Sequence, residues 1–251
     1  MQYEGLAPYY DLLINDMDGQ LRYMTFVKQH IAEGSILELA CGSGILARLL
    51  AKDGYAVHAT DLSSDMIQVA ENAEFLLEDA VQAGLQQDFA NLHFAVMDMR
   101  SFVMQEEYDA ILCFCDSINY VLELDEIRSM AQSVYQALKP NGLFLFDSHS
   151  MDRLTEFASG YEESQFLGDL EYEWTIHTDH DLIRQRLLVW DDSYVPMRYV
   201  EEEHVQRVYD PHVLADVLKN AGFIDIRIWT DFDIEGIAAG EKQFFVGRKQ
   251  G

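Results

Sequence analysis

Short apolar runs alternate with amphipathic stretches from residue 21 to residue 147. Runs that are apolar throughout are typical of strands buried on both faces of a sheet, and apolar residues three and four positions apart are typical of helices. The strands expected on this basis span residues 35–39, 56–61, 92–97, 108–115 and 143–147, and the helices residues 21–31, 45–50, 64–83 and 126–138. Because strands and helices alternate, the pattern predicts a parallel sheet.

The pattern changes after residue 161 to alternating apolar and polar positions. This period of two predicts antiparallel strands at residues 170–176, 182–190 and 199–208. A helix at 211–221 follows, ended by Gly222, and then strands at 224–229 and 243–246. The expected organisation is therefore an N-terminal helical cap (1–34), a cofactor-binding α/β core (35–158), an antiparallel β insertion expected to cover the substrate (159–208) and a segment that completes the core sheet (209–251).

A glycine-rich turn follows the first expected strand. Gly42 and Gly44 remove side chains where the backbone bends sharply and approaches a ligand. The segment from Gly42 to Ala47 also fits GxGxxA, which is typical of dinucleotide-binding folds. In those folds a pyrophosphate lies at the helix N-terminus, and Glu38 at the strand end would repel it. The acid suits instead the ammonium and sulfonium groups of S-adenosylmethionine; a turn that serves packing alone stays open as an alternative.

Later strands also end in acidic residues, namely Asp61, Asp98 and Asp116. Asp61 comes about 20 residues after the glycines, the separation expected of a carboxylate that accepts hydrogen bonds from ribose hydroxyls. For Asp98 the alternative is a cap of the following helix. The carboxyl ends of the strands form the edge of an open α/β sheet where ligands bind. The sequence therefore predicts a nucleoside-binding site at this edge.

The segments ELACGSG, TDLSSDMI, MDM and YDAILCFCDSINY occur in the order found in class I S-adenosylmethionine-dependent methyltransferases, and the chain resembles that family along nearly its whole length. The resemblance implies an α/β fold with a Rossmann-like, seven-stranded, mostly parallel sheet, helices on both faces and a small antiparallel β insertion after the fifth strand. It also implies S-adenosylmethionine as the cofactor. Two other functions stay open: a nicotinamide-dependent oxidoreductase and a non-catalytic S-adenosylmethionine-binding protein.

The same resemblance implies which residues hold the cofactor. They are Glu38, Ala40, Cys41, Gly42, Gly44, Asp61, Leu62, Met66, Asp98, Met99 and Cys115. The residues around the turn would contact the methionine part, Asp61 the ribose hydroxyls, Asp98 the adenine amino group, and Cys115 the cofactor through its carbonyl. Leu62 and Met66 would pack against adenine, although a Met at helical spacing is also typical of a core.

An N-terminal Tyr-Asp segment, the loop at 116–120 and the β insertion resemble small-molecule N-methyltransferases of the amino-sugar and glycine types. The resemblance implies methyl transfer to a small-molecule acceptor, with an amine nitrogen expected. Tyr10 and Tyr120 are placed against the reacting groups, and His149 is a candidate proton acceptor. The amino-sugar enzymes have His at the position of Tyr120, so the general base is left open. Two core tyrosines and a solvated loop histidine are the alternatives.

The composition and charge of the chain limit the kinds of binding partner that are expected. The chain has 251 residues with 44 acidic and 17 basic side chains, a formal charge of −27. Nucleic-acid binding depends on Lys and Arg, so a nucleic-acid substrate is not expected. No apolar run of about 18 residues and no signal-peptide pattern occurs, which favours a cytoplasmic protein without a membrane span. Cys41, Cys113 and Cys115 form no CxxC pair, so no metal site is expected, and the sequence leaves a homodimer open.

Overall fold

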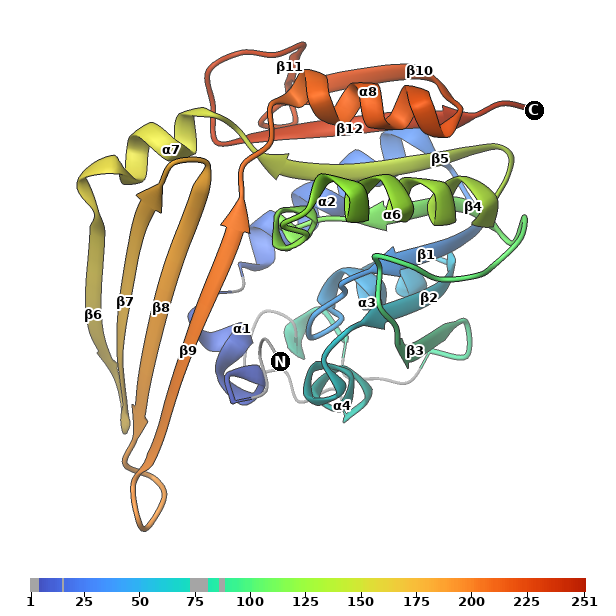
Figure 1. Ribbon diagram of the computed structural model, residues 1–251. Coiled ribbons are helices and arrows are strands. Elements are labelled where there is room, and N and C mark those ends of the chain that lie inside the picture. The colour runs from blue at the N-terminus through green and yellow to red at the C-terminus, as the bar shows by residue number, and fades with distance from the viewer. Residues whose placement is uncertain (1–4, 15, 73–80, 86–88) are drawn as a thin grey trace.

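The computed structural model describes residues 5–14, 16–72, 81–85 and 89–251, and its core is one large twisted sheet (Figure 1). The order of the strands is β11-β10-β12-β5-β4-β1-β2-β3. The strands are β1 (Ser35–Leu39), β2 (Ala56–Asp61), β3 (Leu92–Val96), β4 (Tyr108–Cys113), β5 (Leu138–His149), β10 (Phe223–Thr230), β11 (Ile234–Glu235) and β12 (Lys242–Lys249). Strands β1 to β5 pair in parallel, whereas β12 runs antiparallel to both β5 and β10.

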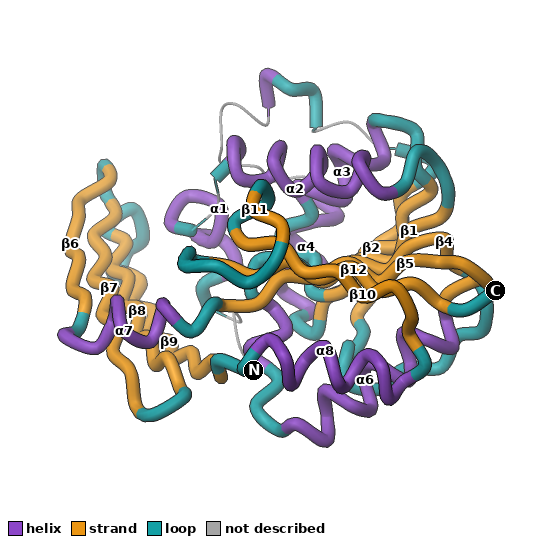
Figure 2. The backbone as a smooth tube through the Cα atoms, turned by 90° about the horizontal axis from the view of Figure 1, so that it is seen from above, coloured by secondary structure: helices purple, strands orange, loops and turns teal. Residues whose placement is uncertain are grey.

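Helices cover both faces of this sheet, as the edge-on view in Figure 2 shows. Helices α2 (Met17–His30) and α3 (Ile45–Lys52) pack on one face, where Phe26 and Leu50 are among the buried side chains. Helices α6 (Leu124–Ala137) and α8 (Pro211–Ala221) pack on the other. The predicted α/β fold is thus confirmed, with the two-residue strand β11 added to the seven expected strands. No helix in the described part of the chain has the length and apolar character needed to cross a membrane.

A second sheet stands beyond the carboxyl ends of the core strands (Figures 1 and 2). It contains β6 (Tyr161–Leu167), β7 (Leu170–Asp179), β8 (Leu182–Asp191) and β9 (Arg198–Arg207), paired antiparallel in that order. The remaining short elements are η1 (Ala7–Tyr9), α1 (Tyr10–Leu13), α4 (Ser64–Asn72), η2 (Ser117–Tyr120), α7 (Asp152–Glu156) and η3 (Phe157–Ser159). One face of the second sheet turns Tyr172, Leu187 and Val189 against Leu6 and Tyr9 of the N-terminal segment.

Several local expectations differ from the structure. Strand β6 was not among the expected strands, because most of its side chains are exposed and give no apolar alternation. The helix expected at residues 64–83 is seen as α4, and part of that range lies outside the described residues. His149 is not in a solvated loop: β5 continues two residues past Asp147, and the His149 side chain is buried.

Candidate active site

The glycine-rich turn has the left-handed backbone that the sequence suggests. Gly42 and Gly44 have φ of 55° and 79°, and Ala40 adopts φ 55° despite its side chain. A Cβ on Gly44 would lie 2.7 Å from the Phe94 ring, whereas one on Gly42 would meet the Tyr10 ring at an ordinary 3.5 Å. Gly44 therefore allows α3 to pack closely, and Gly42 forms part of the surface that Tyr10 covers.

Glu38 lies near the end of β1 with its carboxylate buried behind the turn. Its Oε2 atom has no hydrogen-bond partner among the described residues. Burial, with a smaller effect of the Asp61 charge, raises the pKa of Glu38 to about 8. A buried carboxylate oxygen without a partner is costly, and an ammonium group is the kind of ligand that would satisfy it.

Asp61 at the end of β2 links the turn to the next loop. Its Oδ2 accepts from the Gly42 N–H at 3.0 Å, and its Oδ1 accepts from the Ser63 N–H at 2.8 Å. Burial raises the pKa of Asp61, although these two backbone donors oppose the effect. The carboxylate is thus held rigidly at the carboxyl edge of the sheet.

A cavity of about 360 Å³ opens beside Asp61. Its lining residues include Ala40, Gly42, Asp61, Leu62, Met66, Asp98, Met99 and Cys115, with Tyr10 and Tyr120 at one side. The methionine and leucine side chains give it an apolar slot, and the strand ends supply polar groups. We call it the nucleoside cavity. Glu38 and Cys41 lie outside it, on a small adjoining hollow behind the turn that also contacts Tyr10 and Gly42.

Asp98 lines the nucleoside cavity, but its carboxylate is already occupied. It accepts from the Arg100 guanidinium at 2.6 Å and from the Arg100 backbone N–H at 2.9 Å. These contacts lower the pKa of Asp98, with the Arg100 side chain as the largest cause. The structure therefore brings Asp98 to the cavity with its carboxylate bonded to Arg100 in a turn. The alternative of a helix cap is wrong, because the described residues 97–107 contain no helix.

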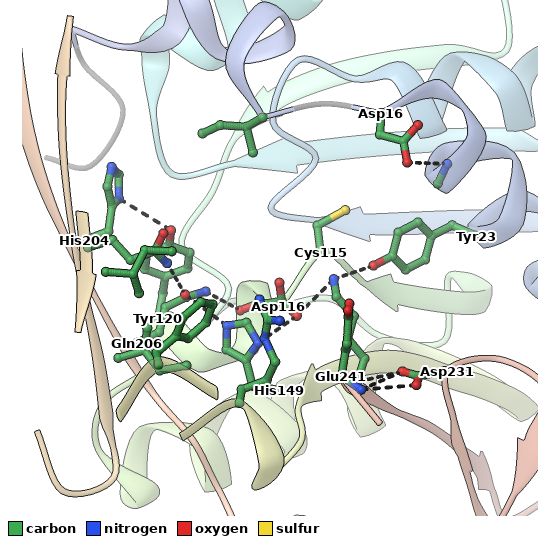
Figure 3. Close-up of a pocket in the computed structure, with 18 of the residues that line it drawn as sticks. Asp16, Tyr23, Cys115, Asp116, Tyr120, His149, His204, Gln206, Asp231 and Glu241 are labelled. Carbon is green, nitrogen blue, oxygen red and sulfur yellow. Dashed lines mark hydrogen bonds and ion pairs between the residues drawn. The ribbon is translucent and has the colours of Figure 1, made fainter. Parts of the chain in front are cut away.

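A larger cavity of about 600 Å³ lies between the core sheet and the second sheet. The second sheet contributes apolar and amide side chains and one histidine to it, namely Trp174, Ile176, Ile183, Gln185, Leu187, His204 and Gln206. The core contributes titratable side chains that include Asp116 and His149 (Figure 3), together with Lys242. We call it the acceptor cavity, because it has room for a second small molecule next to the nucleoside cavity.

Tyr10, Cys115 and Tyr120 line both cavities, so these three residues mark where the two meet. Cys115 and its neighbour Asp116 both have φ of 57°, a conformation that is uncommon for residues with side chains and that clusters at functional sites. Burial, together with the nearby Cys115 and Tyr120 side chains, raises the pKa of Tyr10 well above its ordinary value. The Tyr10 phenol is therefore neutral and can act as a hydrogen-bond partner.

A buried ion cluster forms the core side of the acceptor cavity. Lys242 Nζ lies 3.0 Å from Asp116 Oδ1 and 3.3 Å from Asp147 Oδ2, and it donates to the Tyr23 hydroxyl at 2.8 Å. Tyr23 donates in turn to Asp147 at 2.7 Å. Burial acts against the Lys242 charge, but the two carboxylates outweigh it and raise the pKa of Lys242. The cluster has more acidic than basic groups and so favours a cationic neighbour.

His149 completes this wall of the cavity. Its Nδ1 lies 3.4 Å from Asp116 Oδ1, and its Nε2 lies 3.1 Å from Gln206 Oε1. The Tyr120 hydroxyl lies 3.5 Å from the Nδ1 atom of His204, on the second sheet. Thus the three candidate catalytic residues named from the sequence all line the acceptor cavity, although His149 does not reach the nucleoside cavity.

Sequence reasoning missed the Asp147–Lys242 pair and the two glutamines that the second sheet contributes to the acceptor cavity, Gln185 and Gln206. The strand-end rule that singled out Asp61 also applies to Asp147, so that residue could have been found. Lys242, Gln185 and Gln206 stand in no motif, and only the folding of distant segments brings them to the site.

Comparisons with known proteins agree with this geometry. A family model described as a methyltransferase domain matches residues 36–142. A candidate methyltransferase of Geobacillus sp. strain WCH70 is 32% identical, over 99% of this chain and 100% of that protein. A glycine/sarcosine N-methyltransferase of Aphanothece halophytica is 24% identical, over 91% of this chain and 82% of that protein.

Solved structures share the whole fold. The crystal structure of an S-adenosylmethionine-dependent methyltransferase from Clostridium acetobutylicum matches with a TM-score of 0.78 at 22% identity, over 99% of each chain. The structure of an S-adenosylmethionine-bound amino pentose methyltransferase from Micromonospora echinaspora has a TM-score of 0.68 at 14% identity, over 93% of this chain and 91% of that one. The chain therefore belongs to the class I S-adenosylmethionine-dependent methyltransferases, and not to the nicotinamide-dependent oxidoreductases.

Proposed function

We propose that this enzyme transfers the methyl group of S-adenosylmethionine to an amine nitrogen of a small molecule held in the acceptor cavity. The observation that carries the proposal is the meeting of two cavities at Tyr10, Cys115 and Tyr120. One cavity has the size and lining for a nucleoside, and the other opens beside it. Methyl transfer needs two ligands held in contact, and two cavities that share three lining residues meet this need.

In this proposal the residues at the carboxyl edge hold the cofactor. Glu38 would bind its ammonium group, since Oε2 is buried without a partner among the described residues. Asp61 would accept hydrogen bonds from the ribose hydroxyls, and Leu62 and Met66 would flank the adenine ring. S-adenosylmethionine, when bound, supplies a methyl group on a positively charged sulfur, which is a good leaving group. No nucleophile from the protein is required.

The acceptor cavity supports nitrogen as the acceptor atom. A neutral amine that takes a methyl group becomes an ammonium ion and must release one proton. His149 and Asp116 lie together on the cavity wall and can receive that proton and stabilise the positive charge. Tyr10 and Tyr120, at the junction, would orient the amine through their hydroxyls. The names of the glycine/sarcosine and amino pentose relatives are consistent with an amine acceptor.

The test is transfer of a labelled methyl group from S-adenosylmethionine to a panel of small amines, each paired with the alcohol or acid of the same skeleton. Label is expected in amines and not in their oxygen counterparts. Tyr120→Phe should keep the affinity for S-adenosylhomocysteine and lower turnover, because only an orienting hydroxyl is lost. Label found only in alcohols or carboxylates would refute the choice of nitrogen.

A further inference from the structure

We propose that Gln206 is a positioning residue that holds His149 in the tautomer protonated on Nε2, so that the Nδ1 lone pair faces Asp116. Gln206 comes from β9 of the second sheet, whereas His149 and Asp116 come from the core (Figure 3). Only the use of this lone pair rests on the proposed function. The tautomer of His149 does not depend on which reaction the enzyme catalyses.

The orientation of the Gln185 and Gln206 side-chain amides follows from neighbouring groups that can only donate, or only accept, a hydrogen bond. The Trp174 indole N–H can only donate, and it lies 3.1 Å from Gln185 Oε1, so Gln185 presents its NH₂ group to Gln206 Oε1 at 2.7 Å. At the other end, the backbone carbonyl of Asp116 can only accept, and Gln206 Nε2 donates to it at 3.3 Å. Gln206 Oε1 is therefore the atom that faces His149.

An amide oxygen is an acceptor, so the His149 Nε2 atom, 3.1 Å away, must carry a proton. The other ring nitrogen, Nδ1, is buried and has no hydrogen bond among the described residues, although Asp116 Oδ1 lies 3.4 Å from it. The neutral ring protonated on Nε2 thus has its single N–H satisfied by Gln206. Its Nδ1 lone pair stays beside a carboxylate.

Asp116 would take over the proton if Gln206 were absent. A neutral imidazole carries one N–H, and two acceptors compete for it here: the Gln206 amide oxygen at Nε2 and the Asp116 carboxylate at Nδ1. Burial favours a neutral Asp116, but the positive charge of His149, when that ring is protonated, and the charge of Lys242 oppose this and lower the pKa of Asp116. With a neutral His149 ring, Lys242 Nζ at 3.0 Å still favours the ionised carboxylate. An ionised carboxylate is the stronger acceptor. The Nδ1 atom nevertheless makes no hydrogen bond to Asp116, 3.4 Å away, whereas Nε2 lies within hydrogen-bond distance of the Gln206 amide oxygen. The contact with Gln206 therefore keeps the proton on Nε2.

Other charged and titratable groups surround the pair from each neighbouring element. They are Lys242 and Glu241 at β12, Asp147 in β5, Arg153 in α7, Tyr23 in α2, Tyr120 in η2 and His204 in β9. Lys242 is shared between Asp116 and Asp147, so it neutralises neither carboxylate completely. The negative charge that would stabilise a proton on Nδ1 is therefore retained.

The tautomer decides whether His149 can act on an amine. When a methyl group is transferred, the product ammonium loses one proton, and Nδ1 can take it only if the lone pair is free. The ring then becomes an imidazolium, with Nε2–H bonded to Gln206 and Nδ1–H beside Asp116. If the neutral ring instead carries its proton on Nδ1, this nitrogen has no free lone pair and cannot accept the proton of the product ammonium.

The test is the ¹⁵N spectrum of His149 in full-length protein labelled with ¹⁵N-histidine, recorded by long-range ¹H–¹⁵N correlation above neutral pH. Loss of signals in His149→Gln assigns the ring. In the unmodified protein we expect a protonated Nε2 and an unprotonated Nδ1. In Gln206→Met, which keeps the side-chain length and removes both polar atoms, the unprotonated signal should move from Nδ1 to Nε2.

Two further variants sharpen the result. Gln206→Glu keeps an acceptor for Nε2–H and should preserve the tautomer of the unmodified protein. Gln165→Met, an exposed glutamine of β6 bonded to Glu163, should change nothing. A proton on Nδ1 in the unmodified protein, or an unchanged tautomer in a folded Gln206→Met, would overturn the proposal.

These outcomes are separable from those of the proposed function. If His149 has its proton on Nδ1, the tautomer proposal fails while amine methylation can still be observed. If no amine is methylated, the proposed function fails, and a protonated Nε2 that depends on Gln206 still supports the tautomer proposal.

Discussion

At the scale of single residues, Glu38 should make the free energy of unfolding of the ligand-free protein depend on pH. Burial raises its pKa from an ordinary 4.5 to about 8, so between these pH values the folded protein binds a proton that the unfolded chain releases. The free energy of unfolding should therefore fall as pH rises through this window. Glu38→Gln removes the titration and should be more stable than the unmodified protein at pH 8, by at most about 5 kcal/mol.

Urea unfolding at several values between pH 5 and pH 8 measures this difference. Glu33→Gln, an exposed glutamate just before β1, is the control and should show no such trend. A constant difference between Glu38→Gln and the unmodified protein across the window would contradict the assignment of a raised pKa. Glu38→Gln should also bind S-adenosylhomocysteine more weakly, because the carboxylate for its ammonium group is lost.

Asp61 should contribute to cofactor affinity directly. Asp61→Asn keeps the shape of the side chain but loses the charge and one acceptor, so the ribose hydroxyls would lose a charge-assisted hydrogen bond. We expect calorimetry to show binding of S-adenosylhomocysteine weakened by about 1.5–3 kcal/mol. Asp65→Asn, at the start of α4 and outside the nucleoside cavity, should bind as the unmodified protein does. Equal affinities in both folded variants would remove Asp61 from the site.

Residues in local motifs could be predicted, and residues that depend on long-range contacts could not. Gly42 and Asp61 follow from a strand, a turn and a strand end, which are all visible within a short stretch of sequence. The environment of His149 depends on Gln206, which lies 57 residues away in a different sheet. No local pattern distinguishes a histidine that ends a buried strand from one in a loop, so its burial had to come from the structure.

At the scale of elements, β9 holds the N-terminal segment in place. Glu202 Oε1 accepts from the backbone N–H groups of Gly5 and Leu6 at 2.8 and 3.0 Å. This segment continues into Tyr10, whose ring covers Gly42. Glu202→Ala should therefore speed hydrogen exchange in residues 5–14 and weaken binding of S-adenosylhomocysteine, because Tyr10 loses its support.

Glu201 gives a matched control on the same strand. Its side chain points to the opposite face of the sheet, where it pairs with Arg186 at 2.7 Å. Glu201→Ala should leave exchange in residues 5–14 unchanged. If both variants, or neither, altered exchange there, the Glu202 contacts would not be what holds the segment.

The core elements were predictable because their patterns are strong. Helix α8 occupies residues 211–221 as expected, since Asp210 caps it, Pro211 begins it and Gly222 ends it with φ 106°. Strand β6 was missed because an exposed edge strand needs no apolar face. Strand β6 pairs with β7 at seven positions, and the hydrophobic pattern of the sequence does not predict this pairing.

At the scale of the whole molecule, the sequence predicted the core sheet and a nucleoside-binding site at its carboxyl edge, but not the shape or size of the two cavities. The acceptor cavity exists because the second sheet stands beyond the carboxyl ends of the core strands, and the approach of the two sheets depends on contacts such as Asn119 to the carbonyl of Arg207 at 2.7 Å. The spacing of apolar residues and the turn residues between them determine which helices and strands form. They do not determine how far apart two packed sheets lie.

The net charge of −27 belongs to the molecule as a whole and leads to a last prediction. Mutual repulsion of like charges disfavours the compact state, and salt screens it. Raising NaCl from about 0.01 M to about 0.1 M shortens the Debye length from about 30 Å to about 10 Å, which is less than the width of a domain. The melting temperature of the ligand-free protein, measured by circular dichroism, should therefore rise. KCl should act like NaCl, because screening depends on ionic charge and not on identity. A melting temperature that stays constant or falls would mean that exposed ion pairs such as Lys219–Asp216, which salt weakens, outweigh the repulsion between distant carboxylates.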